Sequence, residues 1–429
     1  MRIPLSLLAL LSAVVLAGCE PSSQAAVAPI GTTAAEPVAG PAIELVATPW
    51  PLPAPDGAAQ PDLVVAPDGS LLLSWIEPDG DGHALRFARH DDDAWSAPRT
   101  IARGDDWFVN WADTPHIVAT ADGALWAHWL RKSAAATYAY DVVLARSGDG
   151  GATWSSPLVV NDDGTPTEHG FASLWAAGPD SIGIAWLDGR ETAGGHGGHG
   201  GGHGAGAMTL RTLRLDATLA RHDETRLDAS TCDCCQTSAA LTADGLLLAY
   251  RDRTAEEVRD IAVVRHDGAR WSAPRIVHAD DWTMPACPVN GPAVAARDDD
   301  AVVAWYTGAG GTPRVRTARS DDAGRTFTAP VELDAGAAVL GRVDVALDER
   351  GAWIAWLRED AAGQALRLVR LQGQSAEPGE AFDVTRVAGR GRGTGMPQLV
   401  SAGGRAHLVW TDVVDGQPRL RGAVVAADR

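Results

Sequence analysis

The sequence predicts an all-β fold, a seven-bladed β-propeller whose blades are four-stranded antiparallel sheets. The main observation is a short apolar run that ends in an aromatic residue and occurs seven times. The terminal aromatic residues lie 51 to 64 residues apart, a period typical of propellers and solenoids. Each run is too short to bury a face alone, so it must pack against its neighbours. The runs are 71–75, 125–129, 182–186, 246–250, 301–305, 352–356 and 406–410.

Within each repeat, the pattern predicts four strands, which we letter A to D from the axis outward. Strand A is apolar and often ends at an Asp-Gly pair, as at 68–69 and 122–123, which is a strong hairpin signal. Strand B is the aromatic-ended run, and strand C alternates apolar and polar residues. Strand D follows a proline, as at Pro98, because an outer edge strand tolerates a missing N–H.

The ring is expected to close with strands from both ends of the chain. The last repeat ends after its third strand, at 420–425, and an unassigned apolar stretch at 42–47 could supply the fourth. Such closure removes an open sheet edge, so we place the N-terminal strand in the last blade. The propeller is therefore expected over 42–429 as one domain, and six blades is the main alternative.

The N-terminus has the features of an export signal over 1–18, with an apolar stretch from 5 to 16 and small residues before Cys19. The segment Leu-Ala-Gly-Cys at 16–19 resembles the bacterial lipobox, which implies cleavage before Cys19 and a lipid on its sulfur. An ordinary secretory signal peptide is the alternative. Residues 19–41 are rich in Ala, Pro, Gly, Ser and Thr and predict a flexible tether. We expect a lipoprotein anchored in the bacterial envelope, in the outer membrane facing the periplasm or the surface.

The charge balance excludes one class of partner. The chain has 36 basic and 55 acidic residues, a net charge of −19. Nucleic acid binding requires a basic surface, so we expect no nucleic-acid partner. We also expect a monomer.

Two turns between strands C and D, at 147–154 and 320–327, share the pattern S-x-D-x-G-x-T-[W/F]. This pattern resembles the Asp-box (BNR repeat) of sialidases and related propellers, and the repeat resemblance covers 42–427. The resemblance implies a structural turn on the face opposite the pocket, in which the carboxylate accepts turn N–H groups and the aromatic residue packs into the blade. The residues concerned are Asp149, Trp154, Asp322 and Phe327.

Sialidase activity is implied only weakly by the resemblance. Sialidases use an arginine triad, a tyrosine nucleophile supported by a glutamate, and an aspartate acid, but here the only Arg-Ile-Pro segment is at 2–4. No Tyr/Glu pair is recognisable among the four tyrosines, so catalytic residues stay unassigned. Arg342 enters strand A of blade six and could bind an anion with loop arginines, or these arginines could be solvated surface groups. The loop arginines are Arg190, Arg251, Arg253 and Arg392.

The up-and-down order of strands places the B–C and D–A loops on one face of the propeller, which we call the pocket face. Three unusual segments map to this face, namely 231–236, 284–288 and the glycine-rich loop 194–206. Together they carry Cys232, Cys234, Cys235, Cys287, His196, His199 and His203.

These cysteines have two interpretations. In an oxidising compartment they would form disulfides, with Cys235–Cys287 as the expected bridge and Cys232 and Cys234 pairing locally or with them. Alternatively, thiolates and imidazoles suit a soft metal, copper first or zinc. The C-x-C-C spacing is not that of an established zinc finger, and the His-Gly loop could be an incidental insertion.

Alignment of the A strands brings seven residues to one equivalent position, which we call the axial ring. We expect these residues to line the central channel and order water or a small ligand, or simply to solvate the channel. Two residues earlier on the same strand face, a second ring forms the expected pocket floor. The axial ring is Asp62, His116, Ser173, Ser238, Ala293, Asp344 and Gln398. The second ring is Gln60, Thr114, Phe171, Gln236, Gly291, Arg342 and Met396.

The expected function is binding of a small ligand or a soft metal at the pocket face. The ligand would contact Arg342, Gln236, His116, Asp62 and Asp344. One alternative is an exo-sialidase-like glycoside hydrolase acting on a glycan, for which Asp-Asp-Trp loops at 105–107 and 280–282 offer paired carboxylates. Another is a protein-interaction platform tethered to the envelope.

Overall fold

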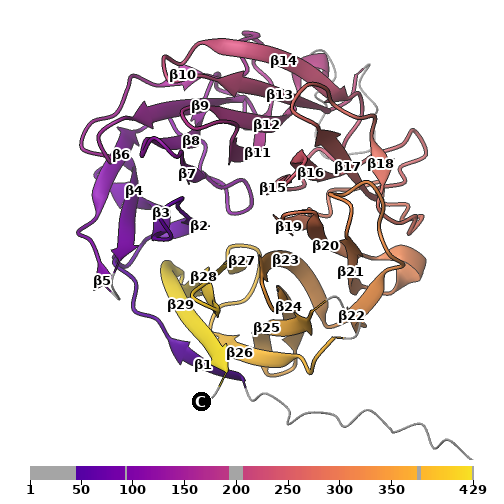
Figure 1. Cartoon of the computed structure of the whole chain (residues 1–429). Helices are drawn as coiled ribbons and strands as arrows, with labels where there is room; N and C mark the ends of the chain where they lie inside the picture. The colour runs from indigo at the N-terminus through magenta and orange to yellow at the C-terminus, as the bar shows by residue number, and fades with distance from the viewer. Residues whose placement is uncertain (1–44, 92–93, 193–205, 374–377, 428–429) are drawn as a thin grey trace, which may run out of the picture. The chain divides into compact units, whose positions relative to one another are not determined.

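The computed structural model describes residues 45–91, 94–192, 206–373 and 378–427, which form a ring of seven β-sheets (Figure 1). The predicted seven-bladed propeller of four-stranded antiparallel blades is confirmed, and six blades is wrong. Two short 3-10 turns, Arg190–Thr192 and Ala309–Gly311, are the helical elements among the described residues. No helix in this part of the chain is long and apolar enough to cross a membrane. The predicted signal and tether, 1–18 and 19–41, lie outside the described residues.

In blades one to six the strands follow one another outward from the axis in chain order. Blade one contains β2 (Ala59–Val65), β3 (Leu71–Asp79), β4 (Gly82–Asp91), the short β5 (Ala94–Trp95) and β6 (Arg99–Gly104). Blades two and three contain β7 (Ile117–Ala119), β8 (Leu125–Lys132), β9 (Tyr140–Ser147), β10 (Leu158–Val159), β11 (His169–Ala176), β12 (Ile182–Asp188), β13 (Thr209–Leu215) and β14 (Arg221–Asp228). Blades four and five contain β15 (Ser238–Thr242), β16 (Gly245–Arg251), β17 (Ile261–His266), β18 (Arg275–Ile276), β19 (Ala293–Arg297), β20 (Asp300–Thr307), β21 (Arg314–Ser320) and β22 (Val331–Ala335). Blade six contains β23 (Val339–Asp348), β24 (Gly351–Asp360), β25 (Gly363–Gln372) and β26 (Phe382–Val387).

Blade seven joins the two ends of the chain, as predicted. It contains β27 (Gly395–Ala402), β28 (Arg405–Val414), β29 (Gln417–Ala427) and, as its outer strand, β1 (Leu45–Pro49). Strand β1 pairs antiparallel with β29 from Leu45↔Ala427 to Pro49↔Ala423, and Figure 1 shows the two strands side by side. The outer edge of β29 is therefore covered, which removes a site for edge-to-edge association.

The aromatic residue that ends each B strand lies in the core between blades. Four of the tryptophans bury their rings fully, and each indole N–H donates to a carboxylate, which satisfies the one polar atom of the side chain. The pairs are Trp75 with Glu77 at 2.8 Å, Trp186 with Asp188 at 2.7 Å, Trp305 with Asp280 at 2.6 Å and Trp356 with Asp334 at 2.8 Å. The repeat thus supplies both the apolar surface and its polar anchor.

The two turns that resemble an Asp-box have matching hydrogen bonds. The Oδ1 atom of Asp149 accepts the backbone N–H of Thr153 at 2.9 Å, and that of Asp322 accepts the N–H of Thr326 at 2.8 Å. Gly151 has a φ of 87°, a backbone conformation that favours glycine. The aromatic residues Trp154 and Phe327 pack against the blade cores. Both turns join strand C to strand D, on the face opposite the pocket face.

Candidate functional site at the pocket face

The strand register confirms the alignment that defines the axial ring. Asp62 lies opposite Ser74, and Asp344 lies opposite Ala355. Both partners are the fourth residue of their aromatic-ended B strand. In their own blades, the fourth residue of the B strand also lies opposite the axial residue, which is Ser173, Ser238, Ala293 or Gln398. These residues are therefore structurally equivalent around the channel.

Polar residues of the axial ring bond to the next blade. The innermost strand of a blade is a sheet edge, so its inward N–H groups need an acceptor from elsewhere. Asp62 Oδ2 accepts the N–H of Ile117 at 2.8 Å, and Asp344 Oδ2 accepts the N–H of Leu399 at 2.6 Å. Ser238 Oγ likewise accepts the N–H of Val294 at 3.0 Å. These side chains join neighbouring blades at the axis, a role that the sequence interpretation did not include.

Three of the five predicted ligand residues, Asp62, His116 and Asp344, lie near one another along the channel. Asp62 Oδ1 lies 2.9 Å from Nδ1 of His116. Withdrawal from water is the largest effect and opposes the charged imidazolium, but Asp62, with smaller contributions from Asp113 and Asp344, raises the pKa of His116. Withdrawal from water also raises the pKa of Asp344 to about 7, and the nearby Asp62 carboxylate acts in the same direction.

The second ring has an unusual backbone. Gln60, Phe171, Arg342 and Met396 have φ values of 50°, 50°, 54° and 55°, in the left-handed region that costs a non-glycine residue about 1 kcal/mol or more. Each lies at a register shift just before the axial residue of its blade. The shift turns the innermost strand at the pocket mouth, and a glycine directly precedes Phe171, Arg342 and Met396.

The two remaining predicted ligand residues converge on the loop that enters blade two. The guanidinium of Arg342 lies 4.9 Å from the ring centroid of Trp111 and donates to the carbonyl of Thr394. Gln236 donates from Nε2 to the carbonyl of Ala112 at 2.9 Å and accepts the N–H of Gly291 at 3.0 Å. Side chains from blades four and six therefore meet a loop of blade two. Burial lowers the pKa of Arg342 to about 10.

Next to this loop lies a cluster of three titratable residues that the sequence interpretation missed, Asp113, Tyr140 and Glu168. The phenolic O–H of Tyr140 donates to Glu168 Oε1 at 2.8 Å, and its oxygen lies 3.4 Å from Asp113 Oδ2. The other Asp113 oxygen accepts the N–H of Phe171 at 2.7 Å. Asp113 and Tyr140 are fully buried, whereas Glu168 is half-buried. The chain of hydrogen bonds thus runs from the interior to the surface.

Burial dominates the electrostatics of this cluster. It raises the pKa of Asp113 to about 8, although the Phe171 N–H acts in the opposite direction. It also raises the pKa of Glu168 to about 7, with the hydrogen bond from Tyr140 opposing it and the Asp233 carboxylate adding to it. Asp113 therefore holds its proton at neutral pH and can donate it toward the Tyr140 oxygen. Glu168 is close to half ionised at neutral pH, as suits a proton donor or acceptor.

The predicted anion-binding arginines already have partners. Arg190 pairs with Asp188 at 2.7 Å, and Asp188 lies in a second cluster with Asp163 and His169. Arg251 is buried and donates to three backbone carbonyls, those of Asn290, Arg259 and Tyr306. Arg253 pairs with Asp233 at 3.1 Å and with Glu257 at 2.6 Å. Arg392 is exposed.

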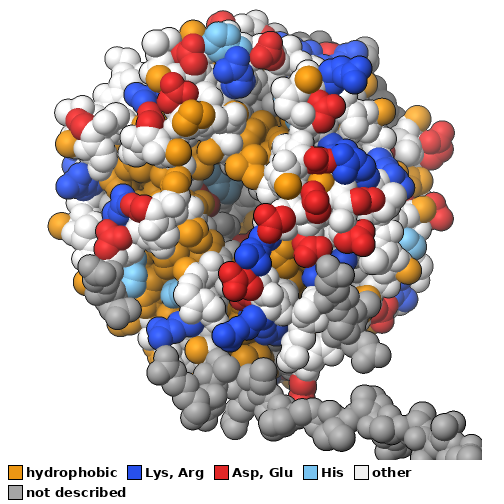
Figure 2. All heavy atoms as spheres, viewed as in Figure 1, with side chains coloured by type: hydrophobic (Ala, Val, Ile, Leu, Met, Phe, Trp, Pro, Cys, Tyr) orange, Lys and Arg blue, Asp and Glu red, His pale blue; other side chains and the backbone are white. Residues whose placement is uncertain are grey.

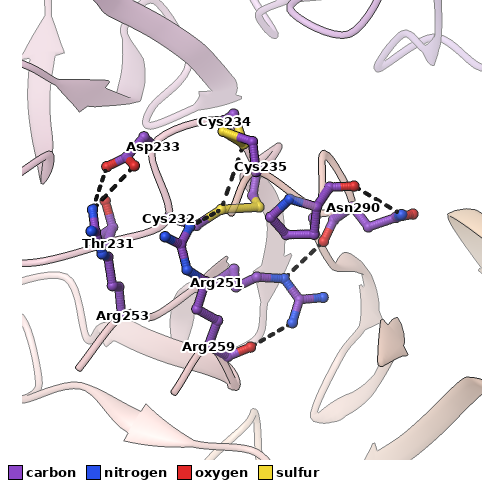
Figure 3. Close-up of a disulfide and its surroundings, with 12 residues drawn as sticks. Thr231, Cys232, Asp233, Cys234, Cys235, Arg251, Arg253, Arg259 and Asn290 are labelled. Carbon is purple, nitrogen blue, oxygen red and sulfur yellow. Dashed lines mark hydrogen bonds and ion pairs between the residues drawn. A yellow bond between two sulfur atoms is a disulfide. The ribbon is translucent and has the colours of Figure 1, made fainter. Parts of the chain in front are cut away.

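The cysteines lie together on the pocket face, as predicted, but the predicted bridge Cys235–Cys287 is wrong. Cys232 pairs with Cys235 (Figure 3), and Cys234 pairs with Cys287. Cys232 and Cys235 end one tight turn with their Cα atoms 5.7 Å apart, so they bridge locally. Cys234 lies between them in sequence, and its Cα is 6.0 Å from that of Cys287 in the next blade.

No cysteine of the described propeller carries a free thiol in this state, so the soft-metal site stays a prediction for the reduced protein. His196, His199 and His203 lie outside the described residues. The Asp-Asp-Trp loop at 280–282 is structural in part, because Asp280 accepts the indole N–H of Trp305 and pairs with Arg316.

Acidic side chains gather over blades four and five on the face in view in Figure 2. Among the charged residues of loops that enter or leave these blades on the pocket face are Asp233, Glu256 and Glu257. Glu256 is exposed, whereas Asp233 and Glu257 are paired with Arg253.

Comparison with known proteins concerns the fold alone. No protein-family model and no curated protein matches the sequence. A protein of unknown function from Dyadobacter fermentans is 14% identical, covers 87% of this chain and 95% of its own, and has a TM-score of 0.47. The phage phi92 endosialidase is 9% identical over 90% of this chain and 70% of its own, with a TM-score of 0.48. An ulvan lyase of polysaccharide lyase family PL25 is 12% identical, covers 77% of this chain and 81% of its own, and has a TM-score of 0.45. We draw no functional argument from these values.

The raised pKa of Asp344 predicts a pH dependence of stability. The folded state holds the Asp344 proton more tightly than the unfolded chain does, so this contribution to stability is complete below the ordinary pKa of 3.8 and is lost as the pH rises through about 7. Asp344→Asn should therefore gain roughly 2 kcal/mol relative to wild type between pH 4 and pH 8, since one pKa unit is about 1.4 kcal/mol and channel water screens part of it. Urea unfolding at both pH values measures the difference.

Asp360→Asn is the matched control. The Arg386 guanidinium holds the pKa of Asp360 below its usual range, so that variant should lose stability relative to wild type as the pH rises from acid to neutral. An unchanged difference for Asp344→Asn at the two pH values would contradict the assignment of a buried, protonated carboxyl at the axis.

Proposed function

We propose that the pocket face binds a small, uncharged or cationic ligand beside Glu168. The observation that carries the proposal is the chain Asp113–Tyr140–Glu168, with one half-buried carboxyl at the mouth and two buried polar groups behind it. Carboxyls with strongly perturbed pKa values that lie together near the surface are a common feature of binding and catalytic sites. A ligand hydroxyl or amine can exchange hydrogen bonds with Glu168 in either protonation state.

The charges around the mouth support this choice of ligand. Two of the arginines that could bind a sugar carboxylate are already paired with carboxylates, Arg190 with Asp188 and Arg253 with Asp233 and Glu257. Asp233 lies close enough to Glu168 to raise its pKa. An anion entering beside Glu168 would meet the carboxyl groups of Glu168 and Asp233. The pairing therefore favours an uncharged glycan or an amine over a sialic acid.

Hydrolysis of a glycosidic bond is a second candidate, favoured by the Tyr140–Glu168 hydrogen bond of 2.8 Å. A carboxyl with a pKa of about 7 can donate its proton to a leaving-group oxygen at neutral pH. Tyr140 is fully buried, so we assign it the positioning of Glu168 rather than attack on the substrate. Asp113 would hold the phenol in place and return a proton through it.

Glu168→Gln tests both candidates. Binding to a glycan array and turnover of aryl glycosides should fall for this variant, turnover by about 100-fold or more if Glu168 is the acid. In the wild type, turnover should decline as the pH rises above about 7, because Glu168 then loses its proton. Glu256→Gln is the control, an exposed carboxylate in a loop of the same face. Equal binding and turnover for wild type and Glu168→Gln would contradict the proposal, and binding without turnover would leave only the first candidate.

We further propose that the propeller is tethered to the bacterial envelope through a lipid on Cys19. The lipobox-like segment at 16–19 and the low-complexity stretch that follows it support this proposal. A fatty-acid probe fed to cells producing the full chain should label the wild-type protein and not Cys19→Ser. Labelling of both forms, or of neither, would contradict the anchor.

A further inference from the structure

The two disulfides of the pocket face lie against each other. We call Cys232, Cys234, Cys235 and Cys287 the sulfur cluster. The Sγ atoms of Cys232, Cys234 and Cys235 all lie within 4.8 Å of one another. The Sγ atoms of Cys232 and Cys234, which belong to different bridges, are 4.0 Å apart. A thiolate formed at Cys234 would therefore face the neighbouring bridge at close range.

The two bridges differ in access from solvent. Cys232 and Cys235 are 0% and 1% exposed. Cys234 is half-buried and Cys287 is exposed. An external thiol can therefore reach the bridge between blades at Cys287, whereas the local bridge is shielded.

A buried cation lies beside the inner bridge. Nη1 of Arg259 donates to Cys232 Sγ at 3.5 Å, and Arg259 is 2% exposed (Figure 3). Its Nη2 atom pairs with Glu257 at 2.9 Å, which fixes the guanidinium in place. Negative charge develops over the three sulfurs in the transition state of thiol–disulfide exchange. A guanidinium at the central sulfur stabilises that charge.

We propose that the sulfur cluster is a thiol–disulfide exchange site whose substrate is an external dithiol. One thiolate of the dithiol attacks Cys287 Sγ, which breaks the Cys234–Cys287 bond and leaves the electron pair on Cys234. The second thiolate of the reagent then attacks the mixed disulfide, so the reagent leaves as a disulfide and Cys287 is released as a thiolate that takes a proton from water. Two electrons have passed from the dithiol to the protein.

The exchange continues inward without further reductant. The Cys234 thiolate attacks Cys232 Sγ, a new Cys232–Cys234 bond forms, and the electron pair leaves on Cys235. This step conserves oxidation state, since one disulfide replaces another. The cluster thus has two reduced isomers, with the second thiol at either Cys234 or Cys235, and the link between blades four and five is open in both. The inference is independent of the ligand proposed at Glu168.

Limited reduction of the full chain tests the proposal. The protein is treated under native conditions with dithiothreitol at one equivalent, quenched in acid, unfolded, alkylated at mildly acidic pH and mapped by mass spectrometry. We expect label on Cys287 and label shared between Cys234 and Cys235. Label confined to Cys234 and Cys287 would overturn the inward step, and label on Cys232 and Cys235 with Cys234–Cys287 intact would overturn the point of entry.

Variants separate exchange from loss of structure. Cys287→Ser leaves a single free thiol without any reductant, and that thiol should again be shared between Cys234 and Cys235; a thiol found at Cys234 alone would overturn the proposal. Arg259→Gln should slow the approach to that distribution by about tenfold. Arg253→Gln is the control, since Arg253 also pairs with Glu257 but bonds to no sulfur. Equal rates for the two arginine variants, with matching circular dichroism and melting temperature, would overturn the role of Arg259.

Discussion

The ring depends on hydrogen bonds that join the innermost strand of one blade to the next. Such a strand has a neighbour on one side only, so its inward N–H groups need acceptors from another source. The carboxylates of Asp62 and Asp344 supply them at 2.8 and 2.6 Å, and the hydroxyl of Ser238 does so at 3.0 Å. This role accounts for the polar residues at three positions of the axial ring, Asp62, Ser238 and Asp344.

The need for hydrogen bonds between neighbouring blades also determines where some titratable groups of the pocket face lie. Asp113 accepts the N–H of Phe171 from the next blade, and burial of its carboxyl raises its pKa to about 8, so it keeps a proton at neutral pH. The proton orients Tyr140, which in turn holds Glu168 at the mouth. On the same face, the Cys234–Cys287 disulfide joins two entering loops covalently. The residues that link one blade to the next are therefore the reactive residues themselves or their direct neighbours.

The fold could be predicted from the sequence because its signals are local and repeated. The aromatic-ended runs and the Asp-Gly turns predict the strands of each blade. The unassigned strand near the N-terminus predicts how the ring closes. The disulfide pairing could not be predicted, because four cysteines in C-x-C-C and one distant site allow several connectivities and the loop path decides among them. The Tyr140–Glu168 pair escaped notice because its residues are 28 positions apart and come from adjacent blades. Neither Tyr140 nor Glu168 belongs to a local sequence motif. The path of the loop into blade three brings the two side chains together.

Amide hydrogen exchange at the inner strands tests the role of the axial side chains most directly. The N–H groups of Ile117, Phe171 and Leu399 each have a carboxyl oxygen as acceptor in the preceding blade. They should exchange as slowly as amides inside the sheets, and Asp62→Ala should speed exchange at Ile117 without affecting Leu399. Rapid exchange at all three amides in the wild-type protein would contradict the conclusion that these side chains hold the blades together.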